Sequence, residues 1–399
     1  MKAQKPLFYL NTNDSSSLLA FGSHSVLRIN KNSVLNEMQK FINENTSKYI
    51  FGFISYDIKN EIENLVSLNN DEVEFPLVYL FVPTYVVKIN GDRHSYIQGK
   101  ENKQTNSFIN DFLNIRSIKT SFSFDWKKRT SKKEYLNKIA LIKEHIRLGD
   151  IYELNYCQEF YADNVNISNP LEVYQLLNKA SLAPFSSFLS FDDLMVFSAS
   201  PERFIKKENN KLYSEPIKGT APRGKDKFSD DKIIKDLKNS PKDHSENVMI
   251  VDLVRNDLSR VATPSSVEVN ELCNLYTFKT VHQLISKISC EVPANVSFTD
   301  ILRATFPMGS MTGAPKISAM KISEEMEDFK RGLYSGSIGY IKPGGDFDFN
   351  VVIRSLLYNA SKKHLSCPVG GAITIESNSE KEYEECLTKV GALMNLFNE

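Results

Sequence analysis

Three short runs, Ser187-Phe188-Leu189-Ser190-Phe191, Met195-Val196-Phe197-Ser198 and Lys211–Ile217, decide the fold class of this chain. They are rich in aromatic and aliphatic residues, which is typical of β-strands. No helix-like run separates them. Strands that follow one another directly favour antiparallel pairing, because parallel neighbours need a long crossover connection. We therefore expect an α+β fold with mainly antiparallel sheets.

The same reading extends outward in both directions. Further strand-like runs are Tyr49–Tyr56, Val78–Ile89, Ile151–Ala162, Gly336–Ile341 and Asn350–Tyr358, and helix-like runs are Ser131–Leu148, Asp230–Leu237, Asp243–Leu258 and Pro315–Lys330. A polar stretch without apolar periodicity begins at Gly99 and continues to about Thr130, which predicts a linker or long surface connection. We expect a sheet-rich N-terminal region, residues 1–125, and a catalytic region, residues 126–399.

Composition limits the possible partners. The chain has 49 Lys and Arg residues and 49 Asp and Glu residues, so no net field draws it to nucleic acid or to an anionic membrane. Its five cysteines are scattered and form no CxxC pair, which argues against a disulfide framework or a zinc site. The chain start lacks the apolar stretch of a secretory signal, and no window approaches the length of a membrane span. We expect a cytoplasmic protein.

Two pairs of carboxylates lie on helix-like runs. Asp243 and Glu246 are spaced i,i+3, and so are Glu382 and Glu385. Each pair therefore shares one face of its helix. Paired acids on a solvated helix face are common, and this is the simplest interpretation of either pair alone. Four acids brought together would need a cation, and oxygen donors suit Mg²⁺.

Lys218 ends a strand-like run within Pro216-Ile217-Lys218-Gly219-Thr220. The glycine that follows permits a close backbone approach to a ligand. A lysine can act as a nucleophile only after losing its proton, which costs about 4–5 kcal/mol at pH 7. Most lysines beside a turn are surface residues, and spacing alone does not exclude that role.

Two glycine-containing segments could bind an anion. Thr312-Gly313-Ala314-Pro315-Lys316 runs into a helix, so free backbone N–H groups there would face a carboxylate or a phosphate. Gly370-Gly371 also permits close backbone approach, and Arg354 is a candidate partner for a carboxylate. None of these signals is decisive alone, because ordinary helix capping produces the same pattern.

Together and in this order, these segments resemble the chorismate-utilising family, which includes anthranilate, aminodeoxychorismate, isochorismate and salicylate synthases. The resemblance spans about residues 131–397. It rests on a whole series of blocks: Ser200-Pro201-Glu202-Arg203, Pro216–Thr220, Lys242–Glu246, Val251–Leu258, His282, Thr312–Lys316, Tyr334–Tyr340, Ile353-Arg354-Ser355 and Glu382–Glu385.

The resemblance implies a fold and a role for each block. The implied fold is two large, mainly antiparallel sheets packed as a sandwich with helices outside, with chorismate bound between them. Glu202 would be the general acid for the departing C4 hydroxyl. The implied Mg²⁺ site comprises Asp243, Glu246, Glu382 and Glu385, and the implied substrate contacts are Thr220, His282, Thr312, Gly313, Tyr340, Arg354, Gly370 and Gly371.

Two positions discriminate among family members. By this resemblance, members that add water at C2 have a lysine at the position of Glu153. The glutamate therefore disfavours isochorismate and salicylate synthesis by this chain. Lys218 resembles the lysine of aminodeoxychorismate synthases, whereas anthranilate synthases have alanine there. The resemblance thus implies a Lys218 adduct at C2, followed by amination at C4 on the route to 4-aminobenzoate and folate. Glu153 departs from the glutamine usual in aminating enzymes.

No cysteine is flanked like the nucleophile of a glutamine amidotransferase, so we expect a separate glutaminase subunit to supply ammonia. Two alternatives stay open. One is an anthranilate synthase with an unusual lysine, which would release pyruvate and anthranilate. The other is a non-catalytic chorismate-binding or regulatory homologue.

Overall fold

The computed structural model describes residues 5–13, 16–31, 33–114 and 122–397. Every strand pairing among these residues is antiparallel, which confirms the predicted α+β class. The pairings join the 19 strands of this part of the chain into one hydrogen-bonded network. Within the network, two arms spread from the long strands β2 (Ser17–Ile29) and β4 (Val78–Asn90), which pair with each other.

The first arm continues from β2 and ends at β7. In pairing order its strands are β1 (Leu7–Asn11), β8 (Phe185–Phe191), β9 (Leu194–Ser200), β18 (Ser355–Asn359), β19 (His364–Ile373) and β7 (Glu153–Ala162). The short strands β6 (Lys127–Lys128) and β15 (Gly313–Ala314) also pair with β7. This arm contains most of the strands that the sequence predicts around residues 151–198.

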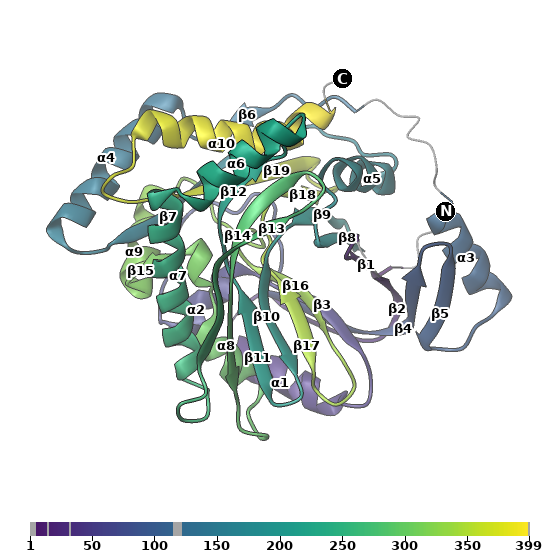
Figure 1. Ribbon diagram of the computed structural model, residues 1–399. Coiled ribbons are helices and arrows are strands. Elements are labelled where there is room, and N and C mark those ends of the chain that lie inside the picture. The colour runs from purple at the N-terminus through teal and green to yellow at the C-terminus, as the bar shows by residue number, and fades with distance from the viewer. Residues whose placement is uncertain (1–4, 14–15, 32, 115–121, 398–399) are drawn as a thin grey trace.

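The second arm continues from β4 through a different set of strands. These are β3 (Ile50–Ile54), β16 (Ser337–Ile341), β17 (Phe347–Asn350), β10 (Arg203–Glu208), β11 (Lys211–Glu215) and β14 (Val281–Glu291). Strands β12 (Ile217–Pro222) and β13 (Glu268–Thr277) lie beside β14, and β5 (Arg93–Gln98) extends β4. Figure 1 shows this arm running down the centre of the molecule.

The arms face each other across a shared apolar core. Val196 of β9 belongs to this core, whereas its neighbour Phe197 points to a second core beneath the outer helices. This alternation is the period of two expected for a strand buried on both faces. Phe191 of the first arm packs against Phe53 of the second, with ring centroids 5.3 Å apart. The described residues therefore form one connected sheet of 19 strands, in place of the two separate sheets that were predicted, because hydrogen bonds between β2 and β4 join the two arms.

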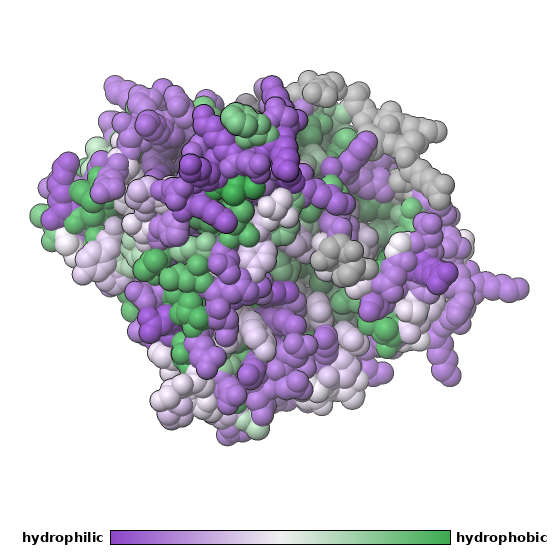
Figure 2. Space-filling view, viewed as in Figure 1, coloured by the Kyte–Doolittle hydropathy of each residue, from purple (hydrophilic) through white to green (hydrophobic). Residues whose placement is uncertain are grey.

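Helices cover the outer surfaces (Figure 1). Helices α4 (Lys132–Leu148), α5 (Pro170–Ser181) and α10 (Ser379–Met394) contact the first arm, and α6 (Lys227–Lys238) and α7 (Pro241–Ser259) contact β12 and β14. The remaining helices are α1 (Val34–Glu44), α2 (Lys59–Ile62), α3 (Lys103–Leu113), α8 (Phe298–Thr305) and α9 (Lys316–Met326), with 3₁₀ turns η1 (Tyr56–Ile58), η2 (Gly309–Met311) and η3 (Asn395–Phe397). Figure 2 shows hydrophobic surface over α7, whereas the edge formed by α4, α10 and α6 is mostly hydrophilic.

Three predicted boundaries were wrong. The predicted linker contains α3, which is held by an Asn102 capping box and by the buried side chains of Phe108 and Ile109. Helix α9 ends at Met326, because Glu327 adopts an extended conformation and pairs with Arg331. The predicted strand at residues 350–358 is two strands in different arms, β17 and β18. Residues 115–121, also in the predicted linker, lie outside the described part.

Candidate active site

The chain crosses between the two arms at two neighbouring links. Residues 201–202 connect β9 to β10, and residues 351–354 connect β17 to β18. The N–H of Val351 donates to the carbonyl oxygen of Glu202 (3.0 Å), so the links are joined. Arg354 lies in the second link with φ of 50°, a conformation that non-glycine residues rarely adopt. Glu202 and Arg354, predicted from separate sequence blocks, therefore lie at the same crossing.

Glu202 is buried and can hold a proton at neutral pH. Burial raises the pKa of its carboxyl group to about 7, against the opposing effects of a Ser310 hydrogen bond and the positive charges of Lys218 and Arg354. The Ser310 hydroxyl donates to Oε1 of Glu202 over 2.6 Å. A carboxylic acid with a pKa near the working pH is suited to general acid catalysis.

Lys218 projects from β12 into the interior. Its Nζ donates to Oε1 of Glu153 over 2.9 Å, and the side chains are 11% and 1% exposed. Burial lowers the pKa of Lys218, but the negative charges of Glu153 and Glu246 outweigh burial and hold the pKa above its ordinary value. Gly219, at φ of 88°, lets this strand end approach α7, because a Cβ there would lie 3.2 Å from the Asp243 side chain. Lys218 is therefore a buried cation facing several acids.

Glu153 is held against the turn that precedes α9. Ala314 of β15 pairs with Glu153 of β7, and a Cβ at Gly313 would lie 2.2 Å from the Glu153 carbonyl oxygen. Thr312 is buried beside them, with its hydroxyl 3.3 Å from the carbonyl oxygens of Met308 and Gly309. The N–H groups of Met311 and Thr312 donate within this turn, so these two are not free to bind an anion as the sequence predicted.

The predicted metal-site acids lie on α7 and α10, as expected. Lys242 connects the two helices, because its Nζ donates to Oε1 of Glu382 (3.0 Å) and lies 3.8 Å from Oε1 of Glu246. Lys389 forms an ion pair with Glu385 (2.8 Å). Within the described ranges, no group of three or more His, Cys, Asp or Glu residues is close enough to hold a metal ion. The four-acid site thus stays a prediction.

The donors nevertheless suit a cation. Oε1 of Glu246 is buried and has no hydrogen-bond partner. Burial raises the pKa of Glu246 to about 7, although Lys218 and Lys242 oppose that rise. The ammonium of Lys242 already places positive charge between Glu246 and Glu382. A divalent cation bound there would relieve the same unfavourable burial of negative charge.

Other predicted substrate contacts are engaged elsewhere. The ring nitrogens of His282 contact Asp230 (2.8 Å) and Thr277 (2.9 Å). Tyr340 stacks on Phe51, with ring centroids 5.6 Å apart. In the part of the chain that is described, no hydrogen bond or ion pair joins His282, Thr220 or Tyr340 to Lys218 or Glu202. Their roles toward substrate stay predictions.

The predicted glycine pair on β19 lies beside the metal-site acids. The carbonyl oxygen of Gly370 accepts from Lys389 (3.0 Å), and a Cβ at Gly371 would lie 4.0 Å from Oε2 of Glu382. A side chain at Gly370 would also clash with Cys157, whose sulfur would be 2.8 Å from its Cβ. The two glycines therefore bring β19 close to α10 and β7, and their contact with a substrate stays a prediction.

Three residues that organise the site were not identified from the sequence. Ser310 binds Glu202, and Lys242 bridges α7 and α10. Arg331 donates to the carbonyl oxygens of Asn155 (2.9 Å) and Met311 (2.7 Å), which flank Glu153 and Thr312. Ser310 lies two residues before the predicted anion-binding segment Thr312–Lys316, and the sequence shows the i,i+4 spacing of Lys242 and Glu246. No sequence signal indicates the Arg331 contacts.

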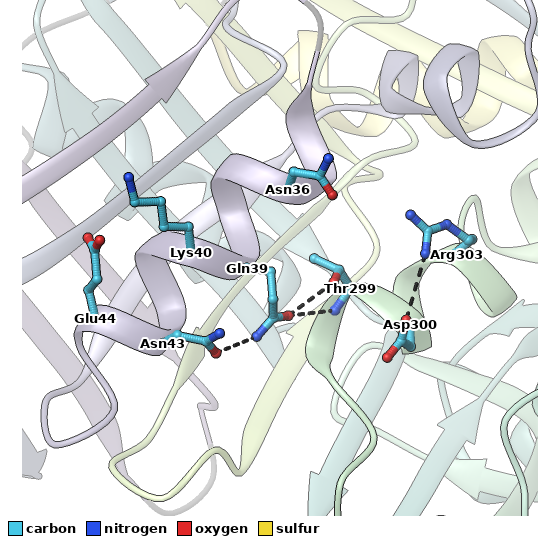
Figure 3. Close-up of a pocket in the computed structure, with 8 residues that line it drawn as sticks. All are labelled: Asn36, Gln39, Lys40, Asn43, Glu44, Thr299, Asp300 and Arg303. Carbon is cyan, nitrogen blue, oxygen red and sulfur yellow. Dashed lines mark hydrogen bonds and ion pairs between the residues drawn. The ribbon is translucent and has the colours of Figure 1, made fainter.

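A separate polar groove lies between α1 and α8 (Figure 3). Gln39 of α1 points to Thr299, whose N–H and hydroxyl both donate to its side-chain oxygen. Asp300 and Arg303 form an ion pair at its other side (3.7 Å). None of the predicted site residues lines this groove. It is therefore distinct from the crossing that carries Glu202.

The fold and this constellation define an α+β protein whose buried titratable groups gather where the chain crosses between two antiparallel arms. The chain belongs to the chorismate-binding enzyme family, whose model matches residues 4–395. No helix in the described ranges has the length and apolar character needed to cross a membrane.

Relatives place the chain within this family, and a solved structure shares its fold. It is 34% identical over 345 residues to aminodeoxychorismate synthase component 1 of Escherichia coli (strain K12), covering 86% of this chain and 75% of that protein. It is 31% identical over 366 residues to anthranilate synthase component 1 of Aquifex aeolicus (strain VF5), covering 86% and 73%. The crystal structure of anthranilate synthase component I from Streptococcus pneumoniae TIGR4 has a TM-score of 0.82 at 23% identity, covering 99% and 95% of the chains. The last likeness concerns the fold.

Proposed function

We propose that this chain is the chorismate-aminating component of an aminodeoxychorismate synthase, which replaces the C4 hydroxyl of chorismate by an amino group and retains the pyruvyl group. The observation that carries the proposal is the buried Lys218, in contact with Glu153 and facing Glu202. Similarity to an aminodeoxychorismate synthase component over most of the chain supports it.

The proposed reaction has two displacements. The Lys218 amine forms a bond to C2 while the C4–oxygen bond breaks, and Glu202 gives its proton to the departing oxygen. Ammonia then forms a bond to C4, and the C2–nitrogen bond to Lys218 breaks. Two displacements through a covalent adduct replace one difficult substitution, which is the usual advantage of nucleophilic catalysis.

The proposal includes Mg²⁺ held by Glu246 and Glu382, with Asp243 and Glu385 beside them. When bound, the metal would neutralise a carboxylate of chorismate. The unpartnered oxygen of Glu246 and the cation already between Glu246 and Glu382 support this assignment. Lys242 would have to move away from Glu382 for these acids to hold the metal.

The ammonia would come from a separate glutaminase subunit. The E. coli relative is named as a component 1, which implies a synthase of several subunits. Four of the five cysteines are buried as free thiols, and Cys273 is partly buried. None of their sequence neighbourhoods is that of a glutaminase nucleophile.

Product analysis tests the proposal. Purified protein receives chorismate, Mg²⁺ and ammonium, and products are identified by mass with and without an added aminodeoxychorismate lyase. We expect 4-amino-4-deoxychorismate, and Lys218→Ala should abolish it and let ammonia enter at C2, giving some anthranilate. If Lys218→Ala formed as much 4-amino product as wild type, Lys218 would not be the nucleophile.

The second candidate is anthranilate synthesis, which similarity to the A. aeolicus enzyme favours. It predicts pyruvate and fluorescent anthranilate from the wild-type protein, with no 4-amino product. A non-catalytic homologue would instead bind chorismate without turnover, which calorimetry detects. The same incubation therefore separates all three functions.

A further inference from the structure

The ion pair between Lys218 and Glu153 poses a chemical problem for the proposed function. A lysine that attacks carbon must first lose a proton, yet Lys218 is buried as an ammonium. We infer that Glu153 is the proton acceptor that frees the Lys218 amine, which makes Glu153 a catalytic residue of the amination. This inference rests on the proposed function and adds a residue to it.

Geometry selects Glu153 among the acids that face Lys218. These are Glu153 on β7, Glu246 on α7 and Glu202 in the link between β9 and β10. Of these three acids, Glu153 is the one that hydrogen-bonds to Nζ, at 2.9 Å. Glu202 is occupied by the Ser310 hydroxyl, and Glu246 lies 3.8 Å from Lys242. Proton transfer from Nζ to Glu153 therefore needs no rearrangement.

The carboxylate of Glu153 is buried, and one of its oxygens is not engaged. Its side chain is 1% exposed, and Oε2 is buried without a hydrogen-bond partner. A buried carboxylate oxygen without a partner lacks compensation for the water it has lost. Transfer converts two buried charges into a neutral amine and a neutral acid, both of which tolerate exclusion of water.

The backbone around Glu153 is fixed from two sides. Gly313 packs against its carbonyl oxygen, and Arg331 donates to the carbonyl oxygens of Asn155 and Met311. Arg331 is itself buried and paired with Glu327. A base held this firmly keeps its reach to Nζ through the reaction, as a catalytic group requires.

The protons and electrons balance over the two displacements. First, an Nζ–H bond breaks and an O–H bond forms on Glu153, and the freed lone pair forms the C2–nitrogen bond. The C4–oxygen bond breaks, and the proton of Glu202 completes a water molecule. Ammonia then adds at C4, the C2–nitrogen bond breaks, and its electron pair returns to Nζ. Glu153 returns its proton to Nζ, and Glu202 takes the proton released by the new C4 ammonium.

The decisive variant is Glu153→Gln, because two roles of Glu153 predict opposite effects. If Glu153 only stabilises the ammonium, removing its charge leaves more free amine at neutral pH, and product formation stays constant or rises. If Glu153 accepts the proton, product formation falls at least about 100-fold at pH 7.5. Labelling of Lys218 by acetic anhydride at pH 7.5, read by peptide mass, should become slower in the same variant, because acylation also needs the free amine.

The pH profile adds a second readout. Without Glu153, solvent hydroxide must take the proton, so the rate of Glu153→Gln relative to wild type should rise about tenfold per pH unit until the amine is free. Glu153→Asp keeps a base but shortens its reach, so we expect about a tenfold loss with an unchanged profile. Activity of Glu153→Gln within threefold of wild type from pH 6 to pH 9 would overturn the inference.

Glu159→Gln is the matched control. Glu159 lies on the same strand, is buried, and pairs with Arg129 (2.7 Å), away from Lys218. It should change neither the labelling of Lys218 nor the pH profile. Circular dichroism checks that each variant folds. If Glu153→Gln does not fold, Glu153→Asp is the test, because full activity of that variant would contradict proton transfer to Glu153. Wild type without 4-amino product would refute the proposed function and this inference together, whereas normal Glu153→Gln activity refutes the inference alone.

Discussion

Two buried lysine–carboxylate pairs in this molecule invite comparison. Lys316 and Asp257 are 2.5 Å apart, with side chains 9% and 7% exposed, and Lys218 and Glu153 are 2.9 Å apart at 11% and 1%. In isolation the two pairs look alike. The difference lies in what surrounds each of them.

The Lys316 pair is satisfied and joins helices. Lys316 of α9 also donates to the carbonyl oxygen of Thr305 at the end of α8 (3.3 Å), and Asp257 belongs to α7. By contrast, Lys218 faces three acids, and one oxygen of Glu153 has no partner. The charged groups of the Lys316 pair are engaged in hydrogen bonds, whereas the Lys218 pair includes one carboxylate oxygen without a partner. This difference predicts distinct consequences when each acid is neutralised.

The largest expected contrast is in stability. Asp257→Asn leaves Lys316 buried with the Thr305 carbonyl, so we expect a loss of about 3–5 kcal/mol in the free energy of unfolding at pH 7.5. Glu153→Gln leaves Lys218 facing Glu202 and Glu246, so we expect a loss below about 1.5 kcal/mol. Urea unfolding followed by circular dichroism measures both. Equal losses would remove the distinction between the two pairs.

The sequence predicted individual helices and strands better than it predicted which strands pair. The strand at Lys211–Glu215 and the acid-bearing helices were predicted from local periodicity, which residues close in sequence determine. The predicted run to Ile217 was too long, because it breaks at Pro216 between β11 and β12. The break between β17 and β18 was not, because crossing from one arm to the other depends on distant strands. The contact of Lys218 with Glu153 joins residues 65 positions apart, and no local pattern encodes it. Local chemistry was therefore predictable, whereas pairing was not.

A second contrast concerns the proton donor. Lys218 faces Glu202, the proposed proton donor, whereas the Lys316 pair has no role in the proposed reaction. We expect Glu202→Gln to reduce kcat at least about 100-fold, because the amide cannot protonate the leaving hydroxyl. The measurement is the initial rate of 4-amino product formation. Ser310→Ala is the control: it keeps the acid and should cost less than tenfold.

The pH dependence sharpens this assignment. Glu202 must be protonated to act, so kcat/KM should fall about tenfold per unit as pH rises above about 7. Because burial raises the pKa of Glu202 in the folded state, the folded protein binds this proton more tightly than the unfolded chain. Its contribution to stability is thus present near pH 4 and lost as pH rises through 7. A falling limb that persists in Glu202→Gln would assign the titration to Glu246 instead.

The smallest expected effect concerns Lys242. Its side chain is 48% exposed and its ammonium pairs with Glu382, so it competes with any cation that binds there. A half-exposed ion pair contributes about 0.5–1 kcal/mol, so Lys242→Met should tighten Mg²⁺ binding by about two- to fivefold, as measured by calorimetry without chorismate. Lys132→Met is the control and should leave the affinity unchanged. It removes a surface ion pair with Glu380, which lies on helix α10 as Glu382 does. An equal gain from both variants would indicate general electrostatic attraction, and weaker binding after Lys242→Met would mean that Lys242 organises the acids for the metal. Tighter binding in Lys242→Met alone would show that the Lys242 ammonium competes with Mg²⁺ for these acids.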